Sequence, residues 1–189
     1  MPAALLLMDF QAGVVDRLGS AEVIATARAA LDAARGHGLP VVYIRVAFRD
    51  GTPEVSSRNK SFSALAAQGR ASAMGSMGVD DPGTQVVEAL SPVAGDVVVV
   101  KRRVSAFTGS DLEVVLRALE VDQLVLAGIA TSGVVLSTVR EAADRDYRLT
   151  VLADACADQD DEVHRVLTEK VFPRQAEVTT VDTWVSTLT

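Results

Sequence analysis

Residues 123–145 are QLVLAGIATSGVVLSTVREAADR: an aliphatic run, then a glycine-containing turn, then an amphipathic stretch. The run from Gln123 to Ala127 has the length and composition of a buried strand, and Ser132 to Arg145 has helical periodicity. A strand that passes directly into a helix is the repeating unit of a parallel sheet with helices on both faces. We therefore expect an α/β fold.

The same unit recurs along the 189 residues. Further runs of strand length are Ala3 to Met8, Pro40 to Val46, Asp96 to Val100, Arg148 to Leu152 and Ala176 to Val181. Amphipathic stretches, several beginning beside Ser or Asp caps, are Ala21 to Arg35, Ser110 to Leu119 and Asp160 to Lys170. This alternation predicts one domain over residues 1–189, a three-layer α/β/α, Rossmann-like, doubly wound sheet of about six mostly parallel strands.

The interval 48–92 interrupts the alternation. It is rich in Gly, Ser, Pro and Met, and only residues 62–68 and 84–90 show short helical patterns. Loops of this length in a compact domain usually have a function. We expect an excursion that forms a lid, a binding loop or a contact between subunits.

Composition argues against several classes of protein. The opening MPAALLLMDF has no basic region or cleavage site and is interrupted by Asp9, and no apolar run reaches the ~20 residues that cross a bilayer. The net charge of -7 would repel nucleic acid. A single cysteine, Cys156, excludes an internal disulfide. We expect a cytoplasmic protein that does not associate with membranes or nucleic acid.

The two histidines, His37 and His164, lie in separate predicted helical regions. They form no cluster of the kind that a zinc site needs, so we expect no metal and no cofactor. His37 resembles the end of a helix, and we expect His164 to be a helix-surface residue without a role in the site.

Three features fall at the carboxyl ends of predicted strands, where open α/β sheets bind ligands. Asp9 ends the first strand, Lys101 ends the run of four valines, and the turn Gly128 to Val134 joins a strand to a helix. A carboxylate and an ammonium group in a partly desolvated cleft adjust each other's pKa, as a general acid or base requires. Backbone N–H groups of the turn suit a substrate oxyanion or carboxylate.

These residues carry a family resemblance. Asp9-Phe10-Gln11, then Val99-Val100-Lys101 with Ser105-Ala106-Phe107, then Gly128 through Thr138, occur in that order, followed by Asp146-Tyr147-Arg148 and Asp154-Ala155-Cys156. As a combination covering nearly the whole chain, this pattern resembles the isochorismatase-like, or cysteine hydrolase, superfamily. The resemblance implies the fold predicted above and a cis peptide bond between Ile129 and Ala130.

The resemblance also implies a triad of Asp, Lys and Cys. By position it puts the acid or base at Asp9 and its cationic partner at Lys101, but the nucleophile position holds Val134, which has no nucleophilic atom. Cys156 follows a different strand, where we expect it to pack. Metal-binding histidines of the nicotinamidase kind are absent after Phe48. The resemblance therefore disfavours a thioester mechanism.

The isochorismatase branch itself lacks the cysteine and hydrolyses a vinyl ether with the aspartate as acid. However, that branch has glycine at the position of Val134, so the substrate can differ. We expect a hydrolase acting on a small, anionic metabolite, with Asp9 as general acid or base and Lys101 as electrostatic partner. The alternative is a disarmed member of the family that binds a small molecule or acts as a scaffold.

The remaining expected substrate contacts come from three parts of the chain: Phe10 and Gln11, then Arg45, Arg103 and Phe107, and then Ile129, Ala130, Thr131, Ser132, Gly133 and Val134. An arginine is needed for an anionic substrate, but the sequence does not decide which one. Thr131 or Ser132 could instead cap the following helix. Ser132 as nucleophile would have only Asp9 as a base. The resemblance further implies a homo-oligomer, a dimer or a tetramer.

Overall fold

The computed structural model describes residues 2–18, 21–69 and 77–188. One sheet of six parallel strands forms its centre, in the order β3-β2-β1-β4-β5-β6. The strands are β1 (Ala3–Met8), β2 (Val41–Val46), β3 (Val97–Lys101), β4 (Gln123–Ile129), β5 (Arg148–Ala157) and β6 (Glu177–Thr179). The predicted fold class is confirmed, and every described strand pair is parallel.

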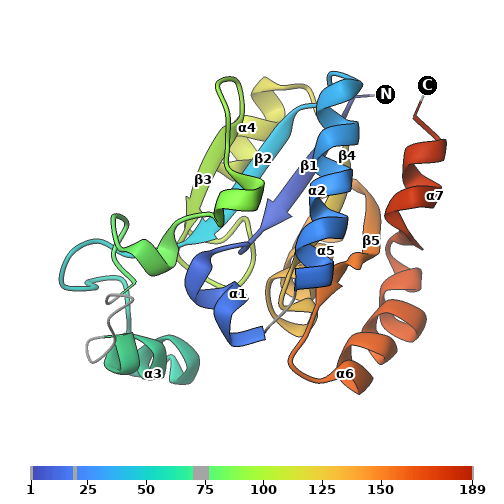
Figure 1. Ribbon diagram of the computed structural model, residues 1–189. Helices are drawn as coiled ribbons and strands as arrows, with labels where there is room; N and C mark the ends of the chain where they lie inside the picture. Colours follow the sequence, from blue (N-terminus) through green and yellow to red (C-terminus); the bar gives the residue numbers. More distant parts are fainter. Residues whose placement is uncertain (1, 19–20, 70–76, 189) are drawn as a thin grey trace.

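Helices cover both faces of the sheet (Figure 1). They are α1 (Ala12–Leu18), α2 (Ala21–Gly36), α3 (Lys60–Gly69), α4 (Leu112–Ala118), α5 (Leu136–Asp144), α6 (Asp161–Val166) and α7 (Val181–Ser186). Single turns of tighter or wider helix are η1 (Pro82–Thr84), η2 (Glu88–Leu90), η3 (Thr131–Val135), η4 (Leu167–Val171) and η5 (Phe172–Arg174).

The sheet separates two apolar cores. Successive residues of a strand face opposite sides, so Leu6 and Met8 of β1 pack with α4 and α5, while Leu5 and Leu7 pack with α2 and α7. All four leucine and methionine side chains are fully buried. Burial on both faces explains why these strands are continuous aliphatic runs rather than alternating patterns.

The structure differs from the predicted elements mainly at their ends. The stretch Ser132 to Arg145 divides into η3 and α5, and Asp160 to Lys170 divides into α6 and η4. β5 continues five residues beyond Leu152, because the pairing of β4 with β5 shifts register between Leu126 and Gly128. The last predicted strand is shorter, since Thr180 caps α7 by accepting a hydrogen bond from the Thr183 N–H.

The interval 48–92 contains α3 and the turns η1 and η2, and residues 70–76 of it lie outside the described part of the chain. Phe62 of α3 packs edge to face against Phe48, with 5.5 Å between the ring centroids. Figure 1 shows α3 beyond the carboxyl ends of the strands. Among the described residues, no helix is both long enough and apolar enough to span a membrane.

Candidate active site

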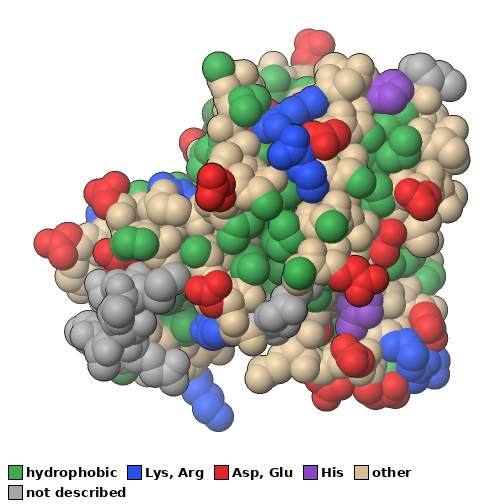
Figure 2. Space-filling view, in the orientation of Figure 1, with side chains coloured by type: hydrophobic (Ala, Val, Ile, Leu, Met, Phe, Trp, Pro, Cys, Tyr) green, Lys and Arg blue, Asp and Glu red, His purple; other side chains and the backbone are tan. Residues whose placement is uncertain are grey.

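A pocket lies at the carboxyl ends of β1 and β4, the neighbouring strands where the order of the sheet reverses. Its volume is about 570 Å³. In the space-filling view, the lower edge of the molecule is indented between α3 and α6 (Figure 2). The pocket is lined by Asp9, Val14, Arg17, Val46, Ser61, Phe62, Leu65, Met77, Lys101, Val104, Ile129, Ala130, Ser132, Gly133, Val134, Asp158 and Gln159.

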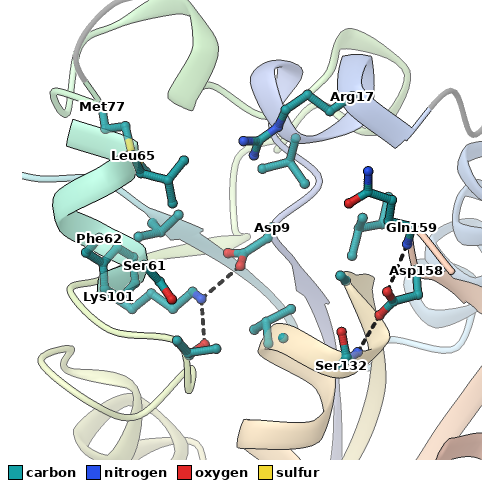
Figure 3. A pocket seen from close by; sticks show the side chains of 17 residues that line it. Asp9, Arg17, Ser61, Phe62, Leu65, Met77, Lys101, Ser132, Asp158 and Gln159 are labelled. Carbon is teal, nitrogen blue, oxygen red and sulfur yellow. Dashed lines mark hydrogen bonds and ion pairs between the residues drawn. The ribbon is translucent and has the colours of Figure 1, made fainter. Parts of the chain in front are cut away.

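An ion pair between Asp9 and Lys101 forms the polar centre of this pocket (Figure 3). Lys101 Nζ lies 2.8 Å from Asp9 Oδ2 and donates a hydrogen bond of 2.7 Å to the Val104 carbonyl oxygen. The Lys101 side chain is only 2% exposed and that of Asp9 10%. The lysine is therefore fixed by two acceptors.

The second oxygen of Asp9, Oδ1, is buried and has no hydrogen-bond partner among the described residues. Burial raises the pKa of Asp9 above its ordinary value, and the charge and hydrogen bond of Lys101 offset that effect only in part. One carboxylate oxygen is thus anchored, while the other is available to exchange a proton with a bound molecule.

The backbone at the end of β1 holds this carboxylate in place. The Asp9 N–H continues the ladder by donating to the Ile44 carbonyl oxygen at 2.8 Å. Asp9 itself has a φ of 58°, in the left-handed region, which Asp tolerates better than most residues. The chain turns sharply there, directly before α1.

The turn after β4 forms the opposite wall. Gly128 lies so close to β1 that a Cβ atom would be 2.8 Å from the Met8 carbonyl oxygen, so only glycine fits. The Ile129–Ala130 peptide bond is cis. Val134, the position at which the resemblance puts a nucleophile, is 1% exposed and gives the pocket an apolar surface.

Two N–H groups of this turn already have acceptors, contrary to our expectation of a free oxyanion site. The Ser132 N–H donates to Asp158 Oδ2 at 2.6 Å, and the Gly133 N–H donates to the Ala130 carbonyl oxygen at 3.1 Å. Ala130 stands at the N-cap position of η3 and no side chain caps this turn, so neither Thr131 nor Ser132 has the capping role considered above.

Thr131 contacts a histidine instead. Its buried hydroxyl oxygen lies 2.8 Å from Nδ1 of His164 on α6. We expected His164 to be a helix-surface residue without a role in the site; it is partly buried, and its ring contacts the turn through Thr131. Sequence spacing gave no sign of this contact, because it joins residues 33 positions apart.

Cys156 lies inside β5, opposite Gly128 in the register with β4. It is 3% exposed, belongs to the core on the α4 and α5 side, and does not line the pocket. Burial raises the pKa of its thiol to about 12. It therefore lacks both the access and the thiolate character of a nucleophile.

Six of the expected substrate contacts do not line the pocket: Phe10, Gln11, Arg45, Arg103, Phe107 and Thr131. Phe10 belongs to the core beside α2, and Phe107 to the other core, where the Arg145 guanidinium lies 4.9 Å from its ring centroid. The Gln11 amide binds the backbone: it donates to the Val46 and Thr84 carbonyl oxygens and accepts from the Val46 N–H. These side chains support the walls.

The two expected arginines are also engaged elsewhere. Arg45 donates to the carbonyl oxygens of Val79 and Thr84. Arg103 donates to the carbonyl oxygens of Arg102 and Glu54, at 2.6 and 3.0 Å. Both fix the excursion against the ends of β2 and β3. Ile129, Ala130, Ser132, Gly133 and Val134 do line the pocket with Asp9 and Lys101, whereas Thr131 lies behind it.

Sequence reasoning missed the arginine that does line the pocket, Arg17. It is exposed, and Figure 3 shows its side chain reaching across from α1, on the side of Asp9 away from Ser132. The ion pairs of the described residues do not include it. Also missed were Asp158 and Gln159, which follow β5, and Ser61, Phe62 and Leu65 of α3.

No group of three or more His, Cys, Asp or Glu side chains that could hold a metal ion occurs in the described ranges. The pocket instead combines an acid with a raised pKa, a fixed lysine, an exposed arginine and apolar walls. Such a set can bind an anionic molecule and transfer a proton to it.

Comparisons with known proteins identify the family of this chain. The isochorismatase domain model matches residues 3–183. The chain is 34% identical over 171 residues to an uncharacterized isochorismatase family protein, YwoC, of Bacillus subtilis strain 168, covering 90% of this chain and 86% of that protein. It is 31% identical over 208 aligned residues to a ureidoacrylate amidohydrolase, RutB, of Stutzerimonas stutzeri strain A1501, covering 98% and 79%.

Among solved structures, a cysteine hydrolase from Pseudomonas syringae pv. phaseolicola 1448A superimposes with a TM-score of 0.87 at 26% identity, covering 97% of this chain and 91% of that one. A match of the family model over nearly the whole length, with a relative above 30% identity, identifies the family. The chain belongs to the isochorismatase family of hydrolases.

Proposed function

We propose that this protein hydrolyses a small, anionic metabolite without a cysteine nucleophile, using Asp9 as general acid or base and Lys101 as its electrostatic partner. The observation that carries the proposal is that Asp9 lines the pocket and that its Oδ1 is buried without a hydrogen-bond partner among the described residues. A buried polar atom left unpaired costs stability, and a ligand bound in the pocket would supply the missing partner of this one.

The character of Asp9 supports proton transfer. Its raised pKa brings the protonated form closer to neutral pH, where a general acid is most effective. Lys101 keeps Oδ2 in place and stabilises negative charge that develops on the carboxylate as the proton leaves. Water would then complete the hydrolysis, because Val134 has no nucleophilic atom, Cys156 is buried, and Ser132 would have only Asp9 as a base.

The anionic character of the substrate is supported by Arg17. Its guanidinium is exposed, and it reaches the pocket from α1. Guanidinium groups pair with carboxylates in bidentate geometry. Arg17 therefore replaces Arg45 and Arg103 as the arginine that we expect to hold a substrate carboxylate.

A second function is favoured by one observation, the valine at position 134. A family member that lost its nucleophile can keep the fold and the pocket and serve as a small-molecule binding or scaffold protein. In that case the pocket would bind a ligand without converting it, and Asp9 would matter only for stability.

A turnover screen separates the two. The purified protein is tested against isochorismate, simple amides, ureido acids and nicotinamide, beside Asp9→Asn. We expect conversion of at least one vinyl ether, amide or ureido acid, lost in the variant. Binding without conversion across these classes, unchanged in Asp9→Asn, would favour the binding protein.

We also propose that the protein works in the cytoplasm as a homo-oligomer, a dimer or a tetramer. Exposed apolar side chains support the oligomer: Val98 of the edge strand β3 is 43% exposed and Val114 of α4 is 69% exposed. Light scattering coupled to size-exclusion chromatography tests it, and a mass of one chain, 19.9 kDa, at micromolar concentration would contradict it.

A further inference from the structure

The pocket has a second charged group that the proposed mechanism does not use, Asp158. It follows β5, and Figure 3 shows it on the side of Asp9 away from Lys101. Asp9 and Lys101 largely neutralise each other, so Arg17 and Asp158 determine which charges a bound molecule can carry. One is positive and the other negative.

Asp158 fills the place that a ligand anion would otherwise take. Its Oδ2 accepts from the Ser132 N–H at 2.6 Å, and its Oδ1 accepts from the Gln159 N–H at 2.9 Å. Burial alone would raise the pKa of Asp158, but hydrogen bonds from Ser132 and from the backbone of Gln159 and Asp160 lower it below the ordinary value. The carboxylate is therefore ionised at neutral pH.

A second anion beside this carboxylate would meet like charge at short range in a partly desolvated pocket, which is unfavourable. An N–H group would be favoured there instead, because the negative charge of the carboxylate attracts a hydrogen-bond donor. The side of the pocket at Asp158 thus suits an N–H group, whereas the side at Arg17 suits a carboxylate.

We infer that Asp158 is a specificity-determining residue that selects substrates with one carboxylate and, at the other end, an amide, ureido or ammonium N–H group, and that rejects dicarboxylates. This inference rests on the proposed function, because the selected molecule is a substrate only if the protein is a hydrolase. The binding preference itself does not depend on turnover.

The test uses two probes of equal length, succinamate and succinate, which differ in having an amide or a second carboxylate. Binding to the ¹⁵N-labelled protein is followed at neutral pH by NMR, from the shifts of the Ser132 and Gln159 amide signals. Asp158→Asn keeps an acceptor for the Ser132 N–H but removes the charge. Asp160→Asn is the matched control, since Asp160 caps α6 and does not line the pocket.

We expect the wild type and Asp160→Asn to bind succinamate roughly tenfold more tightly than succinate, the size of a single like-charge contact of about 1.4 kcal/mol. In Asp158→Asn the ratio should fall to about threefold or less, and Arg17→Gln should weaken the binding of both probes. Equal binding of the two probes by the wild type would overturn the inference. So would an unchanged ratio in Asp158→Asn, or no shift of either signal up to about 50 mM of each probe.

The two proposals fail separately. If the wild type converts none of the screened compounds but still prefers succinamate, Asp158 would be the residue that selects the ligand of a binding protein. Turnover that depends on Asp9, together with equal binding of the two probes, would leave the hydrolase and remove the role of Asp158.

Discussion

The two walls of the pocket differ in what they leave unsatisfied. On one wall, Asp9 and Lys101 are buried and ion-paired, and Asp9 Oδ1 has no hydrogen-bond partner in the part of the chain that the structure describes. On the other, the turn after β4 presents Val134, and the Ser132 N–H is taken by Asp158. We therefore propose that chemistry in this family member depends on the first wall, while the second wall shapes the pocket and selects the ligand.

The ion pair between Arg35 and Asp96 differs from the pair in the pocket. That ion pair is also partly buried, but Asp96 Oδ2 accepts from both Arg35 and the Val93 N–H, and neither residue lines the pocket. Among the described residues, Asp9 has a carboxylate oxygen that is buried without a hydrogen-bond partner, whereas Asp96 has none. Variants of each wall, compared with matched controls, test this distinction.

The largest effect is expected for Asp9→Asn. The amide cannot exchange a proton as a carboxyl group does, so turnover of the best substrate should fall by about 10²–10⁴-fold, the usual contribution of a general acid or base. Steady-state kinetics measure it. Asp96→Asn is the matched control and should change turnover by less than about threefold. Similar losses in both variants would mean that stability, rather than proton transfer, is responsible.

Lys101→Met should lower turnover by about 10²-fold and displace the pH profile. Burial raises the pKa of Asp9 and Lys101 lowers it, so removing the lysine leaves the upward shift unopposed. The limb of the kcat profile that belongs to Asp9 should move to higher pH, whether activity falls through it, as for an acid, or rises, as for a base. A limb that stays in place would disconnect the lysine from Asp9.

Val134→Cys adds a thiol to the second wall, and Val135→Cys is its buried neighbour outside the pocket. If the first wall carries the chemistry, each variant should keep turnover within about tenfold of wild type and lose on the order of 1 kcal/mol of stability. An inactive wild type that gains amide hydrolysis only through Val134→Cys would instead identify a disarmed cysteine hydrolase.

The smallest effect concerns the support of the second wall. Thr131→Val removes the hydrogen bond to His164 and should lower the free energy of unfolding by about 1 kcal/mol in denaturant titration. Thr26→Val, which removes a bond to the Glu22 carbonyl oxygen on the exposed face of α2, should cost less than about 0.5 kcal/mol. Equal costs would show that His164 does not hold the turn.

The fold was predictable because the strands are buried on both faces and are therefore continuous aliphatic runs in the sequence. The short helices α1 and α7 were not, since each has less than two turns and is stabilised by tertiary packing rather than by its own periodicity. Arg17 was missed for that reason: it belongs to α1, between two recognised elements.

The rule that ligands bind at the carboxyl ends of strands found Asp9, Lys101 and the turn at Gly128. It did not find Asp158, because β5 was expected to end at Leu152 and in fact runs to Ala157. The register shift between β4 and β5 that allows this extension depends on both strands, so it leaves no local signal. Contacts between distant residues, such as Thr131 with His164, are hidden in the same way.

The most direct test of hydrolysis without a thiol uses the single cysteine of the chain. Cys156→Ala contains no thiol, and its turnover is measured on the best substrate from the screen, with its thermal unfolding as a check that it is folded. Because Cys156 lies in the core, away from the pocket, we predict turnover within about tenfold of wild type. A folded Cys156→Ala variant without turnover would contradict the account, since the reaction would then need the thiol.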